Sequence, residues 1–348
     1  MVLLLPLKRL AAVSHPPGAP RAEAGAVARF TQVLRRAGLG LAAWLVAGCA
    51  TVLPQSQALR EGWPEQLQAR TELTAVPFYP QRDYECGPAA LAMTLAFAGI
   101  PVTPEVLVPK VYVPARKGTL QVEMLAAPRA YDRVSWQLAP RLQDVLRELD
   151  HGNPVIVLQD YGVWPVRLWH YAVVVGYDRE RQEVMLRSGE KERLSLPFAA
   201  LEYTWRKGAH WAMVAVPPDR IPATATEAGW EAAVAAMERV SSRSAARTAY
   251  RTLLARWPAS LTGAIGLGNV AYAEGDLVTA EQVLRGAVER HGSSDVALNN
   301  LAQVLADQGR RAEALAVVDR AVAVDGPFRA AAERTRAQIQ GPPEALRR

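Results

Sequence analysis

The sequence predicts an α+β domain over residues 71–217, followed by an α-solenoid over residues 227–340. At 348 residues the chain is long enough for two domains. In the first region, short β-rich runs bounded by turn residues are mixed with a helical pattern at residues 142–150. The β-rich runs are 155–158, 170–177, 183–187 and 211–216. After residue 226 the sequence is almost entirely helix-forming, and residues 218–226, rich in Pro, Thr and Ala, are predicted to be a linker.

The last third of the chain repeats every 34 residues. Small residues recur at one position of three units that begin at residues 227, 261 and 295: Ala246, Ala280 and Ala314. Because small side chains let paired helices approach closely, we expect three stacked two-helix units, with residues 329–340 as a capping helix. The pattern resembles the tetratricopeptide repeat, less well in the first unit, and the resemblance implies a groove that binds a peptide or protein partner. A plain helical bundle is the alternative.

The charge of the chain is concentrated near its start. Residues 1–48 contain six Lys or Arg side chains and a single Glu, a net charge of +5, so only +1 of the total +6 belongs to residues 49–348. A nearly neutral body without a basic stripe argues against nucleic acid as a partner. Cys49 and Cys86 alone cannot form a disulfide framework, and the five histidines show no metal-ligand spacing. We therefore expect neither a metal nor another cofactor.

Residues 1–48 have the features of a secretory signal. Arg35 and Arg36 precede an apolar run of about ten residues, shorter than the ~20 that a membrane span needs, and small residues lead to Cys49. The Val-Ala-Gly-Cys sequence that ends at Cys49 resembles the lipobox of bacterial lipoproteins. This resemblance implies a lipid anchor on Cys49, followed by a tether over residues 49–70. Because Ala50 follows the cysteine, it also implies that the protein is located on the periplasmic side of the outer membrane. The alternative is a short uncleaved anchor.

A candidate nucleophile lies in the sequence QRDYECGPAALAM, which contains Gln81 and Cys86. Gly87 and Pro88 follow Cys86 and precede a helical pattern, and proline is well tolerated in the first turn of a helix. The positive end of a helix favours the thiolate, which is the nucleophilic form of cysteine. Five residues upstream, Gln81 is near enough to aim an amide donor beside the sulfur. With the backbone N–H of Cys86, that donor would hold a tetrahedral oxyanion.

The candidate base is His170, which opens the predicted strand HYAVVVGYD. A histidine at the end of a rigid strand can be held against a helix start, as activation of a thiol requires. His210, before the last strand, is the competing candidate. A single free cysteine such as Cys86 is more often a small buried residue than a nucleophile, and a single histidine such as His170 is more often structural than catalytic. Their order in the chain, together with Gln81, favours catalysis.

These two motifs resemble the bacteriocin-leader (double-glycine) peptidases, a papain-like family of cysteine peptidases. The resemblance covers about residues 76–216 and implies Cys86 as nucleophile, His170 as general base and Gln81 as oxyanion donor. In this family the third catalytic residue is an Asp on the strand after the histidine. This chain has Leu-Arg-Ser-Gly there, with Ser188 in the place of the Asp. Asp178 would lie ~26 Å from His170 along a straight strand, too far for contact. If residues 178–183 turn a hairpin, Ser188 or Glu190 lies opposite His170.

Three functions are consistent with these residues. The first is a lipid-anchored cysteine peptidase of the cell envelope, which cleaves a peptide amide through an acyl-thioester on Cys86 while the repeats recruit a protein partner or substrate. The second is an amidase or transferase that uses the same thiol on cell-wall peptides. The third is a non-cleaving assembly factor in which the repeats carry the function. The residues of the two motifs favour an enzyme, whereas the missing Asp favours a weak or inactive one.

Overall fold

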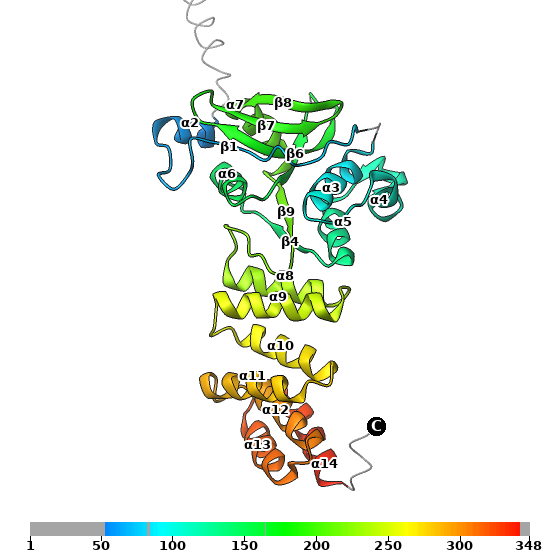
Figure 1. Cartoon of the computed structure of the whole chain (residues 1–348), viewed down its shortest axis with the longest axis vertical. Coiled ribbons are helices and arrows are strands. Elements are labelled where there is room, and N and C mark those ends of the chain that lie inside the picture. Colours follow the sequence, from blue (N-terminus) through cyan, green and yellow to red (C-terminus); the bar gives the residue numbers. More distant parts are fainter. Residues whose placement is uncertain (1–52, 82–83, 164, 342–348) are drawn as a thin grey trace, which may run out of the picture. The chain divides into compact units, whose positions relative to one another are not determined.

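The computed structural model describes residues 53–81, 84–163 and 165–341 (Figure 1). Cys49, its lipobox and the predicted signal lie outside these residues. In the part that is described, no helix is both long and apolar enough to cross a membrane. An α+β domain comes first along the chain and a run of helices follows it, which confirms the predicted fold class.

A seven-stranded antiparallel sheet forms the centre of the first domain. The strands lie in the order β4-β9-β5-β6-β7-β8, and β1 pairs with the second half of β6. Their bounds are β1 Arg70–Glu72, β4 Val134–Gln137, β5 Val155–Asp160, β6 Trp169–Asp178, β7 Glu183–Ser188, β8 Lys191–Pro197 and β9 Ala212–Val216. Each β-rich run of the sequence therefore lies on a strand of this sheet.

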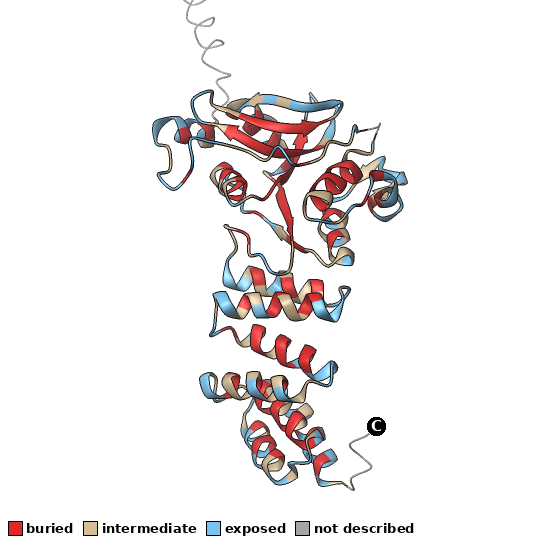
Figure 2. Ribbon diagram, viewed as in Figure 1, coloured by how far each residue is buried: buried red, intermediate tan, exposed pale blue. Residues whose placement is uncertain are grey.

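Alternate residues of the central strands belong to two separate cores. Val155 and Val157 of β5 pack into one core, whereas Ile156 and Leu158 pack into the other. Because side chains alternate between the faces of a strand, a strand buried on both faces is apolar at every position. Figure 2 shows the resulting buried strands. The helices of this domain are α2 Pro54–Glu61, α3 Cys86–Phe97, α4 Pro104–Val111, α5 Gln121–Ala126, α6 Leu142–Asp150 and α7 Phe198–Trp205.

Helix α3 is the buried helix of the second core. Every residue from Gly87 to Leu95 is buried, and a helix that is apolar on all sides belongs inside a domain. A small hairpin of β2 (Tyr112–Val113) and β3 (Gly118–Thr119) packs against the start of this helix. A Cβ atom on Gly87 would lie 2.5 Å from Thr119 Oγ1, so only glycine allows this approach. The hairpin therefore forms a wall beside Cys86.

The two segments that the sequence suggests as connections pack onto the first domain. From Pro54 onward the expected tether forms α2, and the N–H groups of Gln55 and Ser56 donate to the buried carboxylate of Glu202 at 3.0 and 2.7 Å. In the expected linker, the N–H of Thr224 donates to Glu148 Oε1 at 2.7 Å. Both connections are therefore held by hydrogen bonds to the domain.

Seven helices follow residue 226 among the described residues, and each packs against the next (Figure 1). The first helices of the three predicted units begin at Glu227, Leu261 and Asp295, and the last helix spans Arg329–Gln340, as the 34-residue register predicts. The bounds are α8 Glu227–Glu238, α9 Arg243–Arg256, α10 Leu261–Ala273, α11 Leu277–Arg290, α12 Asp295–Asp307, α13 Arg311–Ala323 and α14 Arg329–Gln340. Ala246, Ala280 and Ala314 are all buried between helices.

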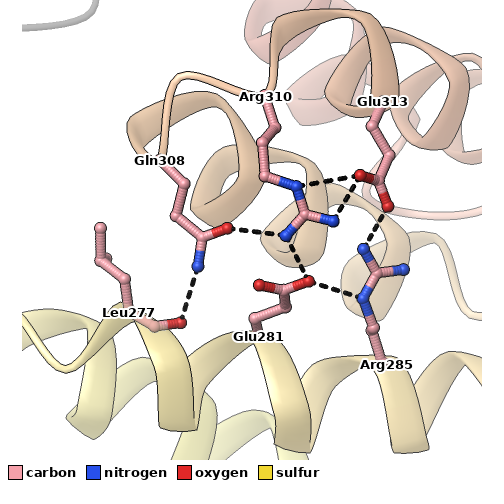
Figure 3. Close-up of polar contacts among 6 residues, drawn as sticks. All are labelled: Leu277, Glu281, Arg285, Gln308, Arg310 and Glu313. Atoms are coloured by element: carbon pink, nitrogen blue, oxygen red, sulfur yellow. Dashed lines mark hydrogen bonds and ion pairs between the residues drawn. The ribbon is translucent and has the colours of Figure 1, made fainter.

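Charged side chains join two neighbouring units of this array. Arg310 donates to Glu281 at 2.6 Å and to Glu313 at 2.5 Å, while Arg285 donates to Glu281 at 2.7 Å and also pairs with Glu313 (Figure 3). We call these four residues the charged seam. It links α11 to α13 and to the turn before α13.

The first repeat unit shares a core with the sheet. Trp230, Val234 and Met237 of α8 belong to the same apolar cluster as Val134 and Val216 of the edge strands β4 and β9. The rings of Trp136 and Trp230 meet edge to face with centroids 6.3 Å apart. The weaker match of the first unit to the repeat pattern thus coincides with its packing against a different kind of neighbour.

Candidate active site

A cleft of about 850 Å³ contains the predicted catalytic residues. Cys86 at the start of α3, His170 on β6 and Gln81 all line it, together with Gly189 in the turn after β7. One wall comes from the hairpin residues 116–121 and the other from residues 207–209 and the end of β5. The fold thus brings together three side chains that are up to 89 positions apart in the chain.

Cys86 is the first residue of α3, as the Gly-Pro motif predicts. Burial raises the pKa of its thiol, and backbone N–H groups of Tyr171, Gly87 and Cys86 that face the sulfur offset this only in part. The net direction is opposite to the one that a helix start favours. The resting form of Cys86 at neutral pH is therefore the thiol, although the N–H groups around it can stabilise negative charge once it forms.

His170 is hydrogen-bonded to Ser188. The imidazole Nε2 and the Ser188 Oγ lie 2.9 Å apart, because the hairpin between β6 and β7 returns the chain to the same end of the sheet. Burial lowers the pKa of His170 to about 4. The imidazole is therefore neutral at pH 7 and able to accept a proton.

Gln81 ties three segments of the site together. Its side-chain Nε2 donates to the carbonyl of Tyr171 at 3.0 Å and to that of Cys86 at 3.4 Å, while its Oε1 accepts the N–H of Gly189 at 2.6 Å. Its backbone N–H donates in return to the Gly189 carbonyl at 3.0 Å. In this arrangement both amide protons of Gln81 have backbone acceptors, so the side chain acts as a brace rather than as a free oxyanion donor.

Two further residues of the site were not found from the sequence. Tyr161 packs its ring on His170, with centroids 5.5 Å apart, and its hydroxyl donates to Gln159 Oε1 at 3.0 Å and also contacts Ser188. Gln159 is fully buried and lies directly opposite His170 in the pairing of β5 with β6. The signal in the sequence was a polar pair, Gln159 and Asp160, that ends an otherwise apolar strand.

The carboxylate next to this network has another partner. Asp160 is fully buried and accepts hydrogen bonds from Arg167 and from the N–H groups of Gly162 and Leu168. Burial raises its pKa, but these donors outweigh that effect and hold the pKa below its usual range. Asp160 thus fixes the loop between β5 and β6 and leaves the contact with the imidazole to Ser188.

The competing candidates lie elsewhere. His210 packs against Trp205 with ring centroids 4.8 Å apart and is not part of the cleft lining. Glu190, which the sequence left open as an alternative to Ser188, is exposed in the turn between β7 and β8. Of the two positions considered for the third catalytic residue, the structure brings Ser188 to His170.

Comparison with known proteins gives a family match in each half of the described chain. Residues 73–207 match the Peptidase_C39 like family, and residues 271–339 match the tetratricopeptide repeat. Residues 73–207 are thus similar to the C39-like peptidases, and we call this region the C39-like domain. One similar solved structure is a crystal structure of a protein from Bacillus anthracis assigned as a C39-like peptidase, with 18% sequence identity and a TM-score of 0.37, covering 43% of this chain and 98% of that one. No curated protein matches the chain.

These matches confirm the peptidase and the tetratricopeptide resemblances found in the sequence. The matched segment contains Gln81, Cys86, His170 and Ser188, and it ends within η3 (Arg206–Gly208) at the edge of the cleft. The repeat match begins in α10, so it omits the unit that shares a core with the sheet. The geometry of the C39-like domain offers a thiol, a neutral base and N–H donors in one cleft, which are the groups that acyl transfer requires.

Proposed function

We propose that the C39-like domain hydrolyses peptide amides with Cys86 as nucleophile and His170 as general base. The observation that carries this proposal is a single cleft that is lined by both side chains, with His170 oriented by its 2.9 Å hydrogen bond to Ser188. If Nε2 carries the imidazole proton and donates it to Ser188, Nδ1 is the nitrogen that accepts a proton from the thiol.

The reaction then follows in two halves. His170 takes the thiol proton as the Cys86 sulfur attacks the carbonyl carbon, and the N–H groups at the start of α3 receive the oxyanion. The intermediate collapses to an acyl-thioester as the imidazolium gives its proton to the leaving amine. Water, deprotonated by His170, releases the acid and restores the thiol.

The neutral resting state distinguishes this site from an ion pair. The thiol has its pKa raised by burial and the imidazole has its pKa lowered to about 4 for the same reason. A thiolate–imidazolium ion pair would therefore form only as the substrate is attacked. Ser188 can fix the imidazole orientation, but it cannot offset the imidazolium charge as a carboxylate would.

The test is cleavage of a peptide library by the full chain, read by mass spectrometry. Cys86→Ser and His170→Ala should each reduce turnover by about 10⁴-fold or more, whereas His210→Ala, a histidine outside the cleft, should retain it. Equal activity in Cys86→Ser and the parent would overturn the proposal. No cleavage by the parent chain would favour the second candidate, a non-cleaving binding factor, which is supported by the serine that replaces the expected acid.

We further propose that Cys49 is acylated and anchors the protein on the periplasmic side of the outer membrane, with the repeats free to recruit a protein partner. The basic flank, apolar run and lipobox support this proposal. Labelling with a fatty-acid analogue should mark the parent and not Cys49→Ser. Unchanged labelling and membrane association in that variant would show the proposal to be wrong.

A further inference from the structure

The cleft is lined by cations without matching anions. Arg116, Lys117 and Lys207 belong to its lining, and no Asp or Glu is among the lining residues that the structure describes. None of the three is in an ion pair with any carboxylate of residues 53–81, 84–163 and 165–341. Arg167, on the loop beside the cleft, does have an acidic partner in Asp160. The described lining of the cleft is therefore positively charged.

Lys207 is held in place at the edge of the cleft. Its ammonium donates to the carbonyl of Gly162 at 2.9 Å and lies 4.6 Å from the centre of the Tyr203 ring. An ammonium has three N–H donors, so two remain for a ligand. Because the side chain is already fixed, a ligand that binds it loses less side-chain entropy than it would on a free lysine.

The cations of the hairpin wall are presented by an unusual backbone. Lys117 has φ of +47° and its ammonium lies 5.9 Å from the ring of Tyr84, which itself has φ of +65°. Ala209, beside Lys207, has φ of +54°. Positive φ is uncommon outside glycine, and such strained residues cluster at active sites and ligand-binding sites. All three line the cleft.

Apolar side chains are exposed between these cations. Leu120, Leu168 and Trp169 line the cleft and are 42%, 60% and 49% exposed. Exposed apolar groups of this size, gathered around one site, indicate contact with a ligand. The complementary ligand therefore carries both apolar and anionic groups.

We propose that the cleft selects peptide segments with carboxylate side chains beside the bond that faces Cys86. This inference rests on the proposed hydrolysis of peptides, and it names the class of substrate. Charge complementarity with Lys207, Arg116 and Lys117 supplies the preference, and Lys207 contributes most because it is already fixed. Apolar side chains of the same peptide contact Leu168 and Trp169.

The test uses two blocked octapeptides that differ only in charge, one with Glu on both sides of a central Leu-Gly pair and one with Gln at the same positions. Each is added to the full chain, and the rate of Cys86 alkylation by iodoacetamide is measured. The Glu peptide should protect Cys86 at about threefold to tenfold lower concentration than the Gln peptide. Lys207→Gln should remove most of this difference. The double variant Arg116→Gln and Lys117→Gln should remove a smaller part of it. Lys110→Gln, the same change outside the cleft, should retain the difference.

Equal protection by the two peptides, or a preference that survives Lys207→Gln together with Arg116→Gln and Lys117→Gln, would overturn the inference. Protection by a short oligonucleotide in preference to the Glu peptide would also overturn it, in favour of a phosphate ligand. Because protection does not require turnover, preference for the Glu peptide without cleavage would refute only the proposed hydrolysis. Cleavage of both peptides at equal rates and equal protection would refute only the acidic preference.

Discussion

The active-site network and the charged seam of the repeats use polar groups in opposite ways. In the cleft, Cys86, His170 and Ser188 are held as neutral groups in a buried setting. In the seam, Glu281 and Arg310 remain charged, and the side chain of Arg310 is 41% exposed. The difference shows that burial decides the charge state where no counter-ion is near, whereas ion pairing decides it where a counter-ion is supplied.

Burial disfavours the charged form of a side chain both at Glu281 and at His170. Burial raises the pKa of Glu281, but hydrogen bonds from Arg285 and Arg310 outweigh it and lower the pKa to about 2. At His170 no such partner intervenes, and burial alone lowers the pKa to about 4. Substitutions at Ser188 and Glu281 would break or sharpen this contrast.

The largest expected effect on stability comes from neither kind of polar contact but from packing in the repeats. A Cβ atom on Gly268 of α10 would lie 2.8 Å from the Leu284 side chain of α11, so Gly268→Ala should destabilise the repeats by ~1–3 kcal/mol. Gly286→Ala is the matched control, because its Cβ would meet only the flexible end of Arg290. Urea unfolding followed by circular dichroism measures both. Equal unfolding midpoints of the two variants would show that packing at Gly268 does not limit the stability of the repeats.

A carboxylate at position 188 should favour the charged form of the imidazole. Ser188→Asp should raise the pKa of His170 by about one unit or more, equivalent to ~1.4 kcal/mol per unit. Because the base must be neutral, hydrolysis in the parent should rise with pH near the His170 pKa of about 4, and in the variant this rise should move to higher pH. The measurement is kcat/KM against pH. Ser188→Ala adds no charge, so kcat/KM of this variant should rise at nearly the same pH as that of the parent.

The thiol should react like a buried group rather than like an ion pair. Since burial raises the pKa of Cys86, its alkylation by iodoacetamide at pH 7 should be slower than that of a free cysteine and should accelerate toward pH 9 and above. Ser188→Asp should increase the rate at neutral pH by stabilising an imidazolium beside the thiolate. Fast alkylation of the parent at pH 6 would show that an ion pair already exists at rest.

The smallest effect is expected at the charged seam. Glu281→Gln should lower the free energy of unfolding by less than about 1 kcal/mol, since partly exposed ion pairs are screened by solvent and salt. The pKa of Glu281 is depressed in the folded protein, so its contribution is present above about 4.5 and is lost as pH falls toward about 2. Unfolding of Glu281→Gln and the parent should therefore converge at pH 2–3. Glu333→Gln, at a pair whose side chains are 52% and 54% exposed, should have no measurable effect.

Much of the fold could be predicted because periodic constraints are local. Stacking requires the same small residues every 34 positions, so the starts of α8, α10 and α12 follow from the register alone. The helix start at Cys86 follows from Gly87 and Pro88, and the β-rich runs predict strands β5, β6, β7 and β9. These signals lie within short stretches of sequence.

The electrostatics of the site could not be predicted in the same way. The helix start at Cys86 suggests a lowered pKa, but burial, which depends on the whole domain, has the larger effect. Likewise the amide of Gln81 is engaged because the turn at Gly189 reaches it from 108 positions away. Tyr161 belongs to neither motif, and only the pairing of β5 with β6 brings it to His170.

The brace formed by Gln81 has a consequence for the order in which the domain folds. Its amide joins the start of α3 to the Tyr171 carbonyl of β6, 90 positions away, and to the turn after β7, 108 positions away. Contacts of such long sequence separation form late, because the intervening chain must first lose its conformational freedom. A chain that emerges from its amino end therefore holds an unassembled thiol until nearly the whole domain has been made. The hydrogen bonds of Gln81 are therefore complete only in a chain that extends through Gly189.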